Sequence, residues 1–131
     1  MSINDYITQL ESVIHSSSIV TSYNLNIDRK TDEVAFISGN IDFRDGSIFD
    51  FKEFIESTEI AIEKYKYGYN YRLGSEILFR YDNAPDPRAK KLKSFPHHKH
   101  LKNGAIIESK QIELSEVLEE IEKVILSKWK I

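Results

Sequence analysis

Cysteine is absent from this chain of 131 residues, and glycine and proline are sparse, with five and three copies. The absence of cysteine excludes disulfides, zinc sites built on thiolates and a thiol nucleophile, and it fits a reducing compartment. No apolar run approaches the roughly 20 residues that a membrane-spanning helix needs. Residues 1–5 lack the basic and apolar regions of a signal peptide, so we expect a cytoplasmic protein.

Several common catalytic motifs are also missing. The sequence has no glycine-rich phosphate loop, no nucleophile elbow, and no metalloprotease or kinase signature. Its net charge of −3 argues against nucleic-acid binding by the whole surface, but it leaves room for a local basic patch. The length, with 40% hydrophobic and 30% charged residues, is typical of one globular domain that spans residues 1–131.

Two segments, one near each end of the chain, carry apolar residues at helical spacing. The first covers residues 3–14, with a capping-box pattern of Ser2 and Asp5 at its start and a run of serines after it. The second covers residues 114–125, where the opposite face is rich in glutamate. Each predicted helix has one apolar face, so both need a surface on which to pack.

Between these segments, alternating apolar and polar residues predict five strands, at about residues 19–27, 33–43, 48–55, 59–71 and 76–82. Residues 105–107 are a candidate for a sixth. Gly46 supplies the positive φ that a hairpin turn after the second strand requires. Four short connections in succession favour a meander. We therefore predict an α+β fold, in which an antiparallel meander sheet of about five or six strands packs against the N- and C-terminal helices.

Residues 79–102 are not explained by this scaffold. They contain three of the four histidines and all three prolines. Residues 88–102 include six lysines or arginines and no acidic residue, although the chain is acidic overall. Residues 83–111 show no clear period, and a loop of this length is usually functional or disordered. A functional site is therefore expected here.

The cluster of His97, His98 and His100 provides side chains that titrate near neutral pH and can both give and take protons. In an extended segment His98 and His100 point to one side, and His97 and Lys99 point to the other. Two histidines on one side, together with a carboxylate, can also bind a divalent metal ion. A solvated basic loop without chemistry is the alternative.

Two carboxylates could serve these histidines. Asp82 ends the fifth predicted strand, where it could orient an imidazole or act as a base, or only shape the turn through its own backbone. Glu53 interrupts the apolar face of the third strand, and a carboxylate half-buried among aromatic residues suits a general acid or base. The alternative for Glu53 is an ion pair with a cross-strand lysine or arginine.

The fourth predicted strand carries a row of tyrosines on one face, namely Tyr65, Tyr67, Tyr69 and Tyr71, and places Lys64 on the other. Such a row can offer stacking platforms for bases, with Arg80 nearby for phosphate. Packing in the core is the more frequent use of an aromatic row, and we expect it for most of the four. Arg80 and Tyr81 lie on opposite faces of their strand, so at most one of them faces a given cleft.

Two short motifs connect the sequence to a known family: Phe79-Arg80-Tyr81-Asp82-Asn83-Ala84-Pro85 and Phe95-Pro96-His97-His98-Lys99-His100-Leu101. Over nearly its whole length the sequence resembles the TumE-like family of small bacterial and archaeal proteins. This family is regarded as the toxin half of type II toxin–antitoxin pairs, encoded beside a helix-turn-helix antitoxin. The resemblance implies a growth-inhibiting toxin.

The motif residues of that family carry over onto this chain as Glu53, Tyr67, Arg80, Tyr81, Asp82, His97, His98, Lys99 and His100. The chain departs from the family pattern after the Asn-Ala-Pro. Many relatives have a histidine there, whereas this chain has Asp86, Pro87 and Arg88, followed by a lysine-rich run. A role for a histidine at that point therefore does not carry over.

From the residues and the resemblance together, we predict a toxin that acts on RNA as a metal-independent endoribonuclease. In this hypothesis His98 or His100 takes the proton of a ribose 2′-hydroxyl. Another of the three histidines, His97 included, protonates the leaving oxygen. Lys99 and Arg80 stabilise the charge of the phosphorane through charge-assisted hydrogen bonds.

The remaining motif residues have supporting roles in this hypothesis. Glu53 and Asp82 orient the imidazoles, and Tyr67 and Tyr81 contribute to substrate binding. No cofactor is required, and the expected partners are RNA, a helix-turn-helix antitoxin and a second copy of the chain, because an exposed sheet edge needs cover. Two other functions stay open: a non-enzymatic domain that binds nucleic acid or protein, and a metal-dependent nuclease or nucleotidyl transferase that uses Asp82 with the two same-side histidines.

Overall fold

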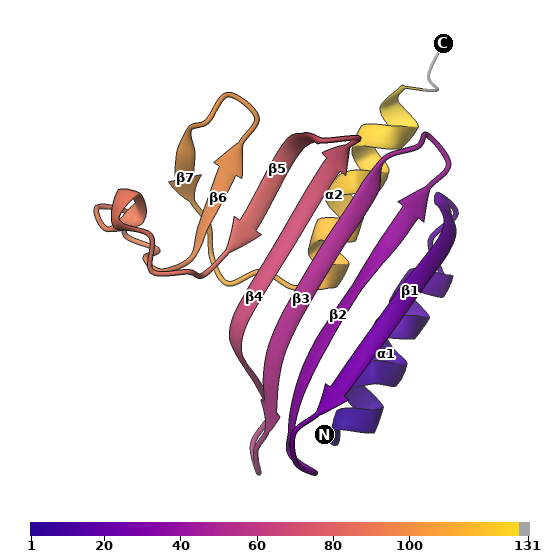
Figure 1. The fold of residues 1–131 in the computed structure, drawn as a ribbon, viewed down its shortest axis with the longest axis vertical. Helices are drawn as coiled ribbons and strands as arrows, with labels where there is room; N and C mark the ends of the chain where they lie inside the picture. The colour runs from indigo at the N-terminus through magenta and orange to yellow at the C-terminus, as the bar shows by residue number, and fades with distance from the viewer. Residues whose placement is uncertain (129–131) are drawn as a thin grey trace.

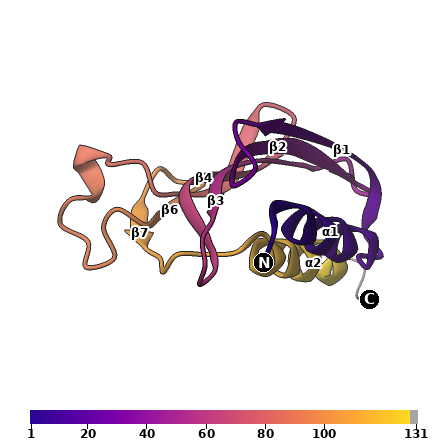
Figure 2. The same ribbon diagram turned by 90° about the horizontal axis from the view of Figure 1, so that it is seen from below.

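The computed structural model describes residues 1–128, which form one antiparallel sheet with a helix from each end of the chain packed on the same face (Figure 1, Figure 2). The elements are, in chain order, α1 (Ile3–His15), β1 (Val20–Arg29), β2 (Val34–Phe43), β3 (Ile48–Ser57), β4 (Ile62–Leu73), β5 (Glu76–Asp82), the 3₁₀ turn η1 (Pro87–Ala89), β6 (His98–Leu101), β7 (Ile106–Glu108) and α2 (Leu114–Ser127). The strands lie in the sheet in sequence order. The predicted α+β meander is confirmed, with seven strands in the described range instead of five or six. No helix within residues 1–128 is long and apolar enough to cross a membrane.

Both helices form where the sequence provides an apolar stripe. At the start of α1 the Ser2 hydroxyl accepts a hydrogen bond from the Asp5 amide, and the Asp5 carboxylate accepts one from the Ser2 amide. The stripes bury residues three or four positions apart: Ile3, Ile7, Leu10 and Ile14 in α1, and Leu114, Val117, Leu118, Ile121 and Ile125 in α2. Figure 2 shows both helices beneath the strands, so the opposite face of the sheet stays open.

The sheet has an apolar face and a polar face because successive side chains alternate. Toward the helices, Gly39 pairs with Phe51, Phe51 with Tyr69, and Tyr69 with Tyr81. On the open face a polar row crosses five strands: Ser38, Lys52, Gly68, Asp82 and His98. This row leads from the middle of the sheet to the short strand β6.

A β-bulge in β4 changes which side chains face the helices. The register shifts where Phe54 and Ile55 meet β4, so that Ile55 pairs with Lys64. Lys64 therefore points inward and is buried, whereas Tyr65 is 52% exposed. The prediction that Tyr65 continues the inward row and that Lys64 faces outward was wrong, because a bulge adds one residue and reverses the alternation beyond it.

The segment predicted to have no clear period contains β6 and β7. The four residues of β6 extend the sheet from β5, and the three residues of β7 extend it from β6. Figure 1 shows this hairpin and η1 extending past the two helices. The candidate strand at residues 105–107 lies within one residue of β7. The prediction missed β6 because its four residues, His98 to Leu101, are mostly polar and too few to show an alternating pattern.

Candidate functional site

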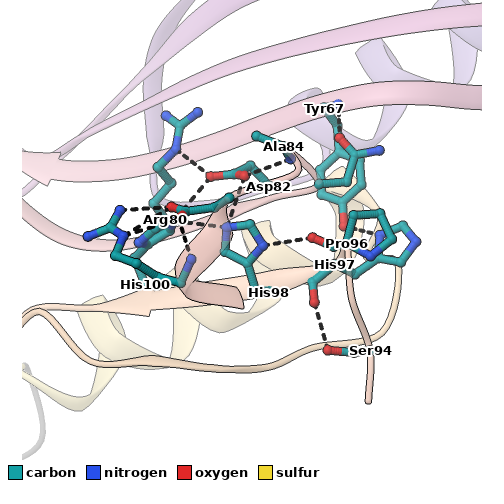
Figure 3. A network of polar contacts seen from close by, with 12 residues as sticks. Tyr67, Arg80, Asp82, Ala84, Ser94, Pro96, His97, His98 and His100 are labelled. Carbon is teal, nitrogen blue, oxygen red and sulfur yellow. Dashed lines mark hydrogen bonds and ion pairs between the residues drawn. The ribbon is translucent and has the colours of Figure 1, made fainter. Parts of the chain in front are cut away.

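The pairing of β5 with β6 brings the strongest candidate residues together on the open face of the sheet (Figure 3). Asp82 is opposite His98, and Arg80 is opposite His100. Alternate residues of a strand point to the same side, so these four side chains share one face. The two-residue spacing thus placed both histidines correctly relative to each other.

Asp82, His98 and His100 converge on one small volume. The Nε2 atoms of the two histidines are 3.0 Å apart. The Nε2 of His98 lies 3.1 Å from Oδ1 of Asp82, and the Nε2 of His100 lies 3.3 Å from Oδ2. One nitrogen or oxygen atom of each residue lies within 4.8 Å of those of the other two. We call these three residues the Asp-His-His cluster.

Neighbouring groups fix the orientation of the cluster. The Nδ1 of His98 is 2.7 Å from the carbonyl oxygen of Pro96, so in a neutral ring Nδ1 donates there and the Nε2 lone pair faces the cluster. The Ala84 amide donates to Oδ1 of Asp82 at 2.9 Å. The Nε of Arg80 donates to Oδ2, also at 2.9 Å. The carboxylate therefore has little freedom to rotate.

Burial differs among the members of the cluster. His98 is completely buried and Asp82 nearly so, whereas 22% of the His100 side chain is exposed. Burial lowers the pKa of His100 against the opposing effect of Asp82, and the neighbouring His98, Arg80 and Arg88 add to this lowering. At neutral pH the His100 imidazole is therefore largely uncharged.

A groove runs along the open face beside the cluster. One part, of about 530 Å³, crosses β1 to β5 and is lined mainly by polar side chains, including four asparagines. The other part, of about 580 Å³, lies against the loop after β5 and is lined by Asp82 and Phe95 among others. Phe36, Lys52 and Arg80 line both parts. Two positive charges therefore lie where the two parts of the groove meet, and one of them, Arg80, contacts Asp82 of the cluster.

The family model described as Toxin TumE matches residues 10–125, which is most of the chain. The chain belongs to the TumE toxin family. The resemblance carried by the two motifs of residues 79–101 is thereby confirmed, and membership in a TumE toxin family implies an antitoxin as partner. No curated protein and no solved structure matches the chain.

In this TumE-family toxin, Glu53 lies on the face that the helices cover. It is completely buried, and its carboxylate accepts hydrogen bonds from the hydroxyls of Tyr6 and Tyr69. The Nζ of Lys64 is 3.9 Å from the same carboxylate. Of the two roles considered for Glu53, the structure contains the cross-strand ion pair. The imidazoles of the Asp-His-His cluster are on the other face of the sheet.

Lys99 and Tyr81 also point toward the helices. The Nζ of Lys99 is 2.7 Å from the carboxylate of Glu120 on α2, and the Tyr81 hydroxyl donates to the same carboxylate at 2.6 Å. The ammonium lies over the rings of Phe79 and Tyr81, 4.8 and 4.9 Å from their centres. These two motif residues thus tie β5 and β6 to α2, on the face opposite the cluster.

His97 and Tyr67 form a separate pair (Figure 3). The Tyr67 hydroxyl is 2.8 Å from Nδ1 of His97, and the two rings stack with centres 5.8 Å apart. Burial and the charge of Lys64 lower the pKa of His97. The opposite placement of His97 and His98 follows the alternation that the sequence predicted.

Lys52 and Gly68 are groove residues that the prediction did not single out. A Cβ on Gly68 would lie 2.9 Å from a guanidinium nitrogen of Arg80 and 3.2 Å from Cε of Lys52. The glycine therefore leaves room for both long side chains to lie across the sheet. An isolated glycine inside a strand often marks such a close approach, and this signal was present in the sequence.

Proposed function

We propose that this TumE-family toxin cleaves RNA, and that the Asp-His-His cluster activates the nucleophile. The observation that supports this best is the convergence of two imidazoles and a carboxylate beside Arg80, a residue that lines both parts of the groove. A cluster of this size can act on a single reacting atom while the groove holds the strand on either side. Titratable groups in such a cleft are frequently catalytic.

Cleavage through a ribose 2′-hydroxyl needs a group that takes the hydroxyl proton and positive charge that stabilises the phosphorane. The 2′-oxygen forms a bond to phosphorus, the bond from phosphorus to the 5′-oxygen breaks, and the leaving oxygen takes a proton from water. The products are a 2′,3′-cyclic phosphate and a 5′-hydroxyl. In this proposal the cluster accepts the proton, and Arg80 and Lys52 bind the phosphate.

The short distance between the two histidines favours a shared role for them. In an in-line displacement the attacking and leaving oxygens lie on opposite sides of phosphorus, so a base and an acid that serve them stand apart. The Nε2 atoms of His98 and His100 are 3.0 Å apart. We therefore assign both to the attacking oxygen, and we revise the hypothesis in which a second histidine protonates the leaving oxygen.

The groove also offers contacts for bases. Phe36, Tyr65 and Phe95 line the part that adjoins Asp82. Aromatic rings that are open to solvent stack on unpaired bases, with little regard to sequence. Single-stranded RNA is therefore the proposed substrate class, with Tyr65 taking the place that the sequence-based hypothesis gave to Tyr67.

Incubation of the purified protein with a single-stranded RNA tests the proposal. The wild-type protein is expected to release fragments that end in a 2′,3′-cyclic phosphate, identified by mass spectrometry. His100→Ala removes the partly exposed member of the cluster and is expected to lower the cleavage rate about 100-fold or more, the usual contribution of a positioned proton acceptor. His97→Ala is the matched control, because it removes the neighbouring imidazole on the other face, and it is expected to retain the wild-type rate.

Equal cleavage by the wild type and His100→Ala, with both proteins folded by circular dichroism, would remove the cluster from the reaction. RNA that is bound in a salt-sensitive manner but stays intact would favour the alternative, a non-enzymatic domain that binds nucleic acid.

The proposed partners follow from the toxin family and from the sheet. We propose a helix-turn-helix protein encoded beside the toxin as its antitoxin, in line with the resemblance to toxin–antitoxin pairs. A second copy of the chain is a further proposed partner, because β1 is an edge strand and an unpaired edge is prone to pair with another chain.

A further inference from the structure

The ring of His98 is fixed at one end and faces the Asp-His-His cluster at the other. The carbonyl oxygen of Pro96, 2.7 Å from Nδ1, can only accept a hydrogen bond, so Nδ1 carries the hydrogen. In the neutral ring Nε2 then presents a lone pair to Oδ1 of Asp82 at 3.1 Å. Facing lone pairs repel, and a hydrogen on the Nε2 of His100, 3.0 Å away, or a cation shared by the cluster would remove this repulsion.

The separations within the cluster are close to those between ligands of one metal ion. Zinc binds nitrogen and oxygen at about 2.0–2.2 Å, so two ligands of a tetrahedral site are roughly 3.3–3.5 Å apart. The corresponding distances here are 3.0 Å between the histidines, and 3.1 and 3.3 Å from His98 and His100 to Asp82. A small outward shift of each group would place all three on one ion.

The outer contacts of the cluster also resemble those of metal ligands. A ligating histidine usually donates its other N–H to a carbonyl or carboxylate, as His98 does to Pro96. The carboxylate of Asp82 is held by the Ala84 amide and by Arg80. Each oxygen of Asp82 accepts one of these hydrogen bonds, Oδ1 from Ala84 and Oδ2 from Arg80, and keeps a second lone pair for an ion.

We propose that Asp82, His98 and His100 bind one divalent transition-metal ion of the zinc class, with a further position open to water. The catalytic role of this ion rests on the proposed RNA cleavage, whereas its binding can be tested without RNA. Imidazole nitrogen suits zinc and its first-row neighbours, whereas Mg²⁺ prefers oxygen ligands. Three protein ligands, two of them histidine and one a carboxylate, with one open position, are typical of a catalytic zinc site.

A bound zinc ion lowers the pKa of a water ligand to about 7. The hydroxide would take the 2′-hydroxyl proton and become water, so the step needs no free imidazole. The ion and Arg80 would share the negative charge of the phosphorane. This assignment also explains why both imidazoles point to the same place.

Calorimetric titration of the chelator-treated full chain with Zn²⁺ tests the site without RNA. One ion is expected to bind per chain, and excess Mg²⁺ is not expected to displace it. Co²⁺ is expected to bind the same site and to show the visible absorption of a four- or five-coordinate ion. His100→Ala is expected to weaken Zn²⁺ binding at least about 100-fold, since even changes outside the ligand set cost 10–100-fold. His97→Ala is expected to leave the affinity unchanged.

The other outcomes bear on either the proposed metal site or the proposed RNA cleavage. Equal Zn²⁺ affinity in the wild type and His100→Ala, or no binding in either, would overturn the metal site. Cleavage that continues after chelation would overturn the catalytic role of the ion, and would leave His100 as the proton acceptor. Zn²⁺ binding without cleavage of any RNA would support the site and overturn the proposed function.

Discussion

The buried carboxylate of Glu53 joins three parts of the molecule. It accepts hydrogen bonds from Tyr6 of α1 and from Tyr69 of β4. The nearby Lys64 donates to the Tyr69 hydroxyl at 2.6 Å and to the carbonyl of Ile112, just before α2, at 2.8 Å. A buried charge is costly unless its polar neighbours pair with it, so this network stabilises the contact between the sheet and both helices.

Glu53→Ala is expected to lower the free energy of unfolding by about 3 kcal/mol, because two tyrosine hydroxyls and an ammonium lose a buried partner. The rate of RNA cleavage per folded molecule is expected to stay unchanged, since Glu53 and the Asp-His-His cluster are on opposite faces. Urea unfolding followed by circular dichroism measures the stability. Glu56→Ala, which removes a surface carboxylate bound to Tyr65, is the control and is expected to cost about 1 kcal/mol at most. Lost cleavage at full stability would instead give Glu53 the catalytic role that the family motif suggests.

The side on which a residue lies could be predicted where the backbone alone decides it. Alternation along an extended chain was enough to separate His98 and His100 from His97, and Arg80 from Tyr81. The same alternation placed Lys99 on the side opposite these two histidines, but its partner could not be predicted, because Lys99 meets Glu120 only once α2 is in place. Contacts between segments that are far apart in the sequence decide the partner of such a side chain.

Two glycines in the central strands, Gly39 of β2 and Gly68 of β4, have different surroundings. A Cβ on Gly39 would lie 2.2 Å from the backbone oxygen of Asn24 and 2.7 Å from the ring of Phe51. A Cβ on Gly68 would meet the end of the Arg80 side chain, at 2.9 Å. A flexible side chain can move aside, whereas the backbone of a paired strand cannot. The same substitution therefore has different consequences at the two positions.

Gly39→Ala is expected to destabilise the fold by roughly 2 kcal/mol or more, because the added methyl group overpacks the sheet. Gly68→Ala is expected to keep the stability or raise it by up to about 1 kcal/mol, since glycine weakens a strand interior. It should nevertheless slow RNA cleavage, because the methyl group displaces Arg80 from Asp82. Thermal unfolding and the RNA assay measure the two effects separately. Wild-type cleavage by a folded Gly68→Ala protein would show that the position of Arg80 is not required.

Length and regularity decided which elements could be predicted. The two helices and the strands β1 to β5 carry enough periodic residues to be recognised, and the predicted range of β5 agrees with the structure. The four residues of β6 form a strand because β5 offers an open edge, which is a property of the folded sheet. The Asp-His-His cluster depends on that pairing, so the sequence could suggest its members but not their distances.

The whole molecule separates stability and the proposed chemistry onto two faces of one sheet. The helices cover one face (Figure 2), and the cluster (Figure 3) lies on the other. The groove lies on that open face as well. Six of the seven tyrosines are on the covered side: Tyr6, Tyr23, Tyr67, Tyr69, Tyr71 and Tyr81. Burial raises the pKa of each of these phenols. Their ionisation is therefore coupled to the fold.

The protein is expected to unfold cooperatively in alkali, at about pH 11–12. An unfolded tyrosine has a pKa of about 10, so above that pH the folded state binds more protons than the unfolded state. The contribution of these tyrosines to stability is complete below about pH 10 and is lost as the pH rises further. Phenolate absorbance should thus appear together with the loss of far-ultraviolet circular dichroism. Tyr65→Phe, at an exposed tyrosine, should leave the midpoint unchanged. Independent ionisation near pH 10 with the sheet intact would contradict the burial of these phenols.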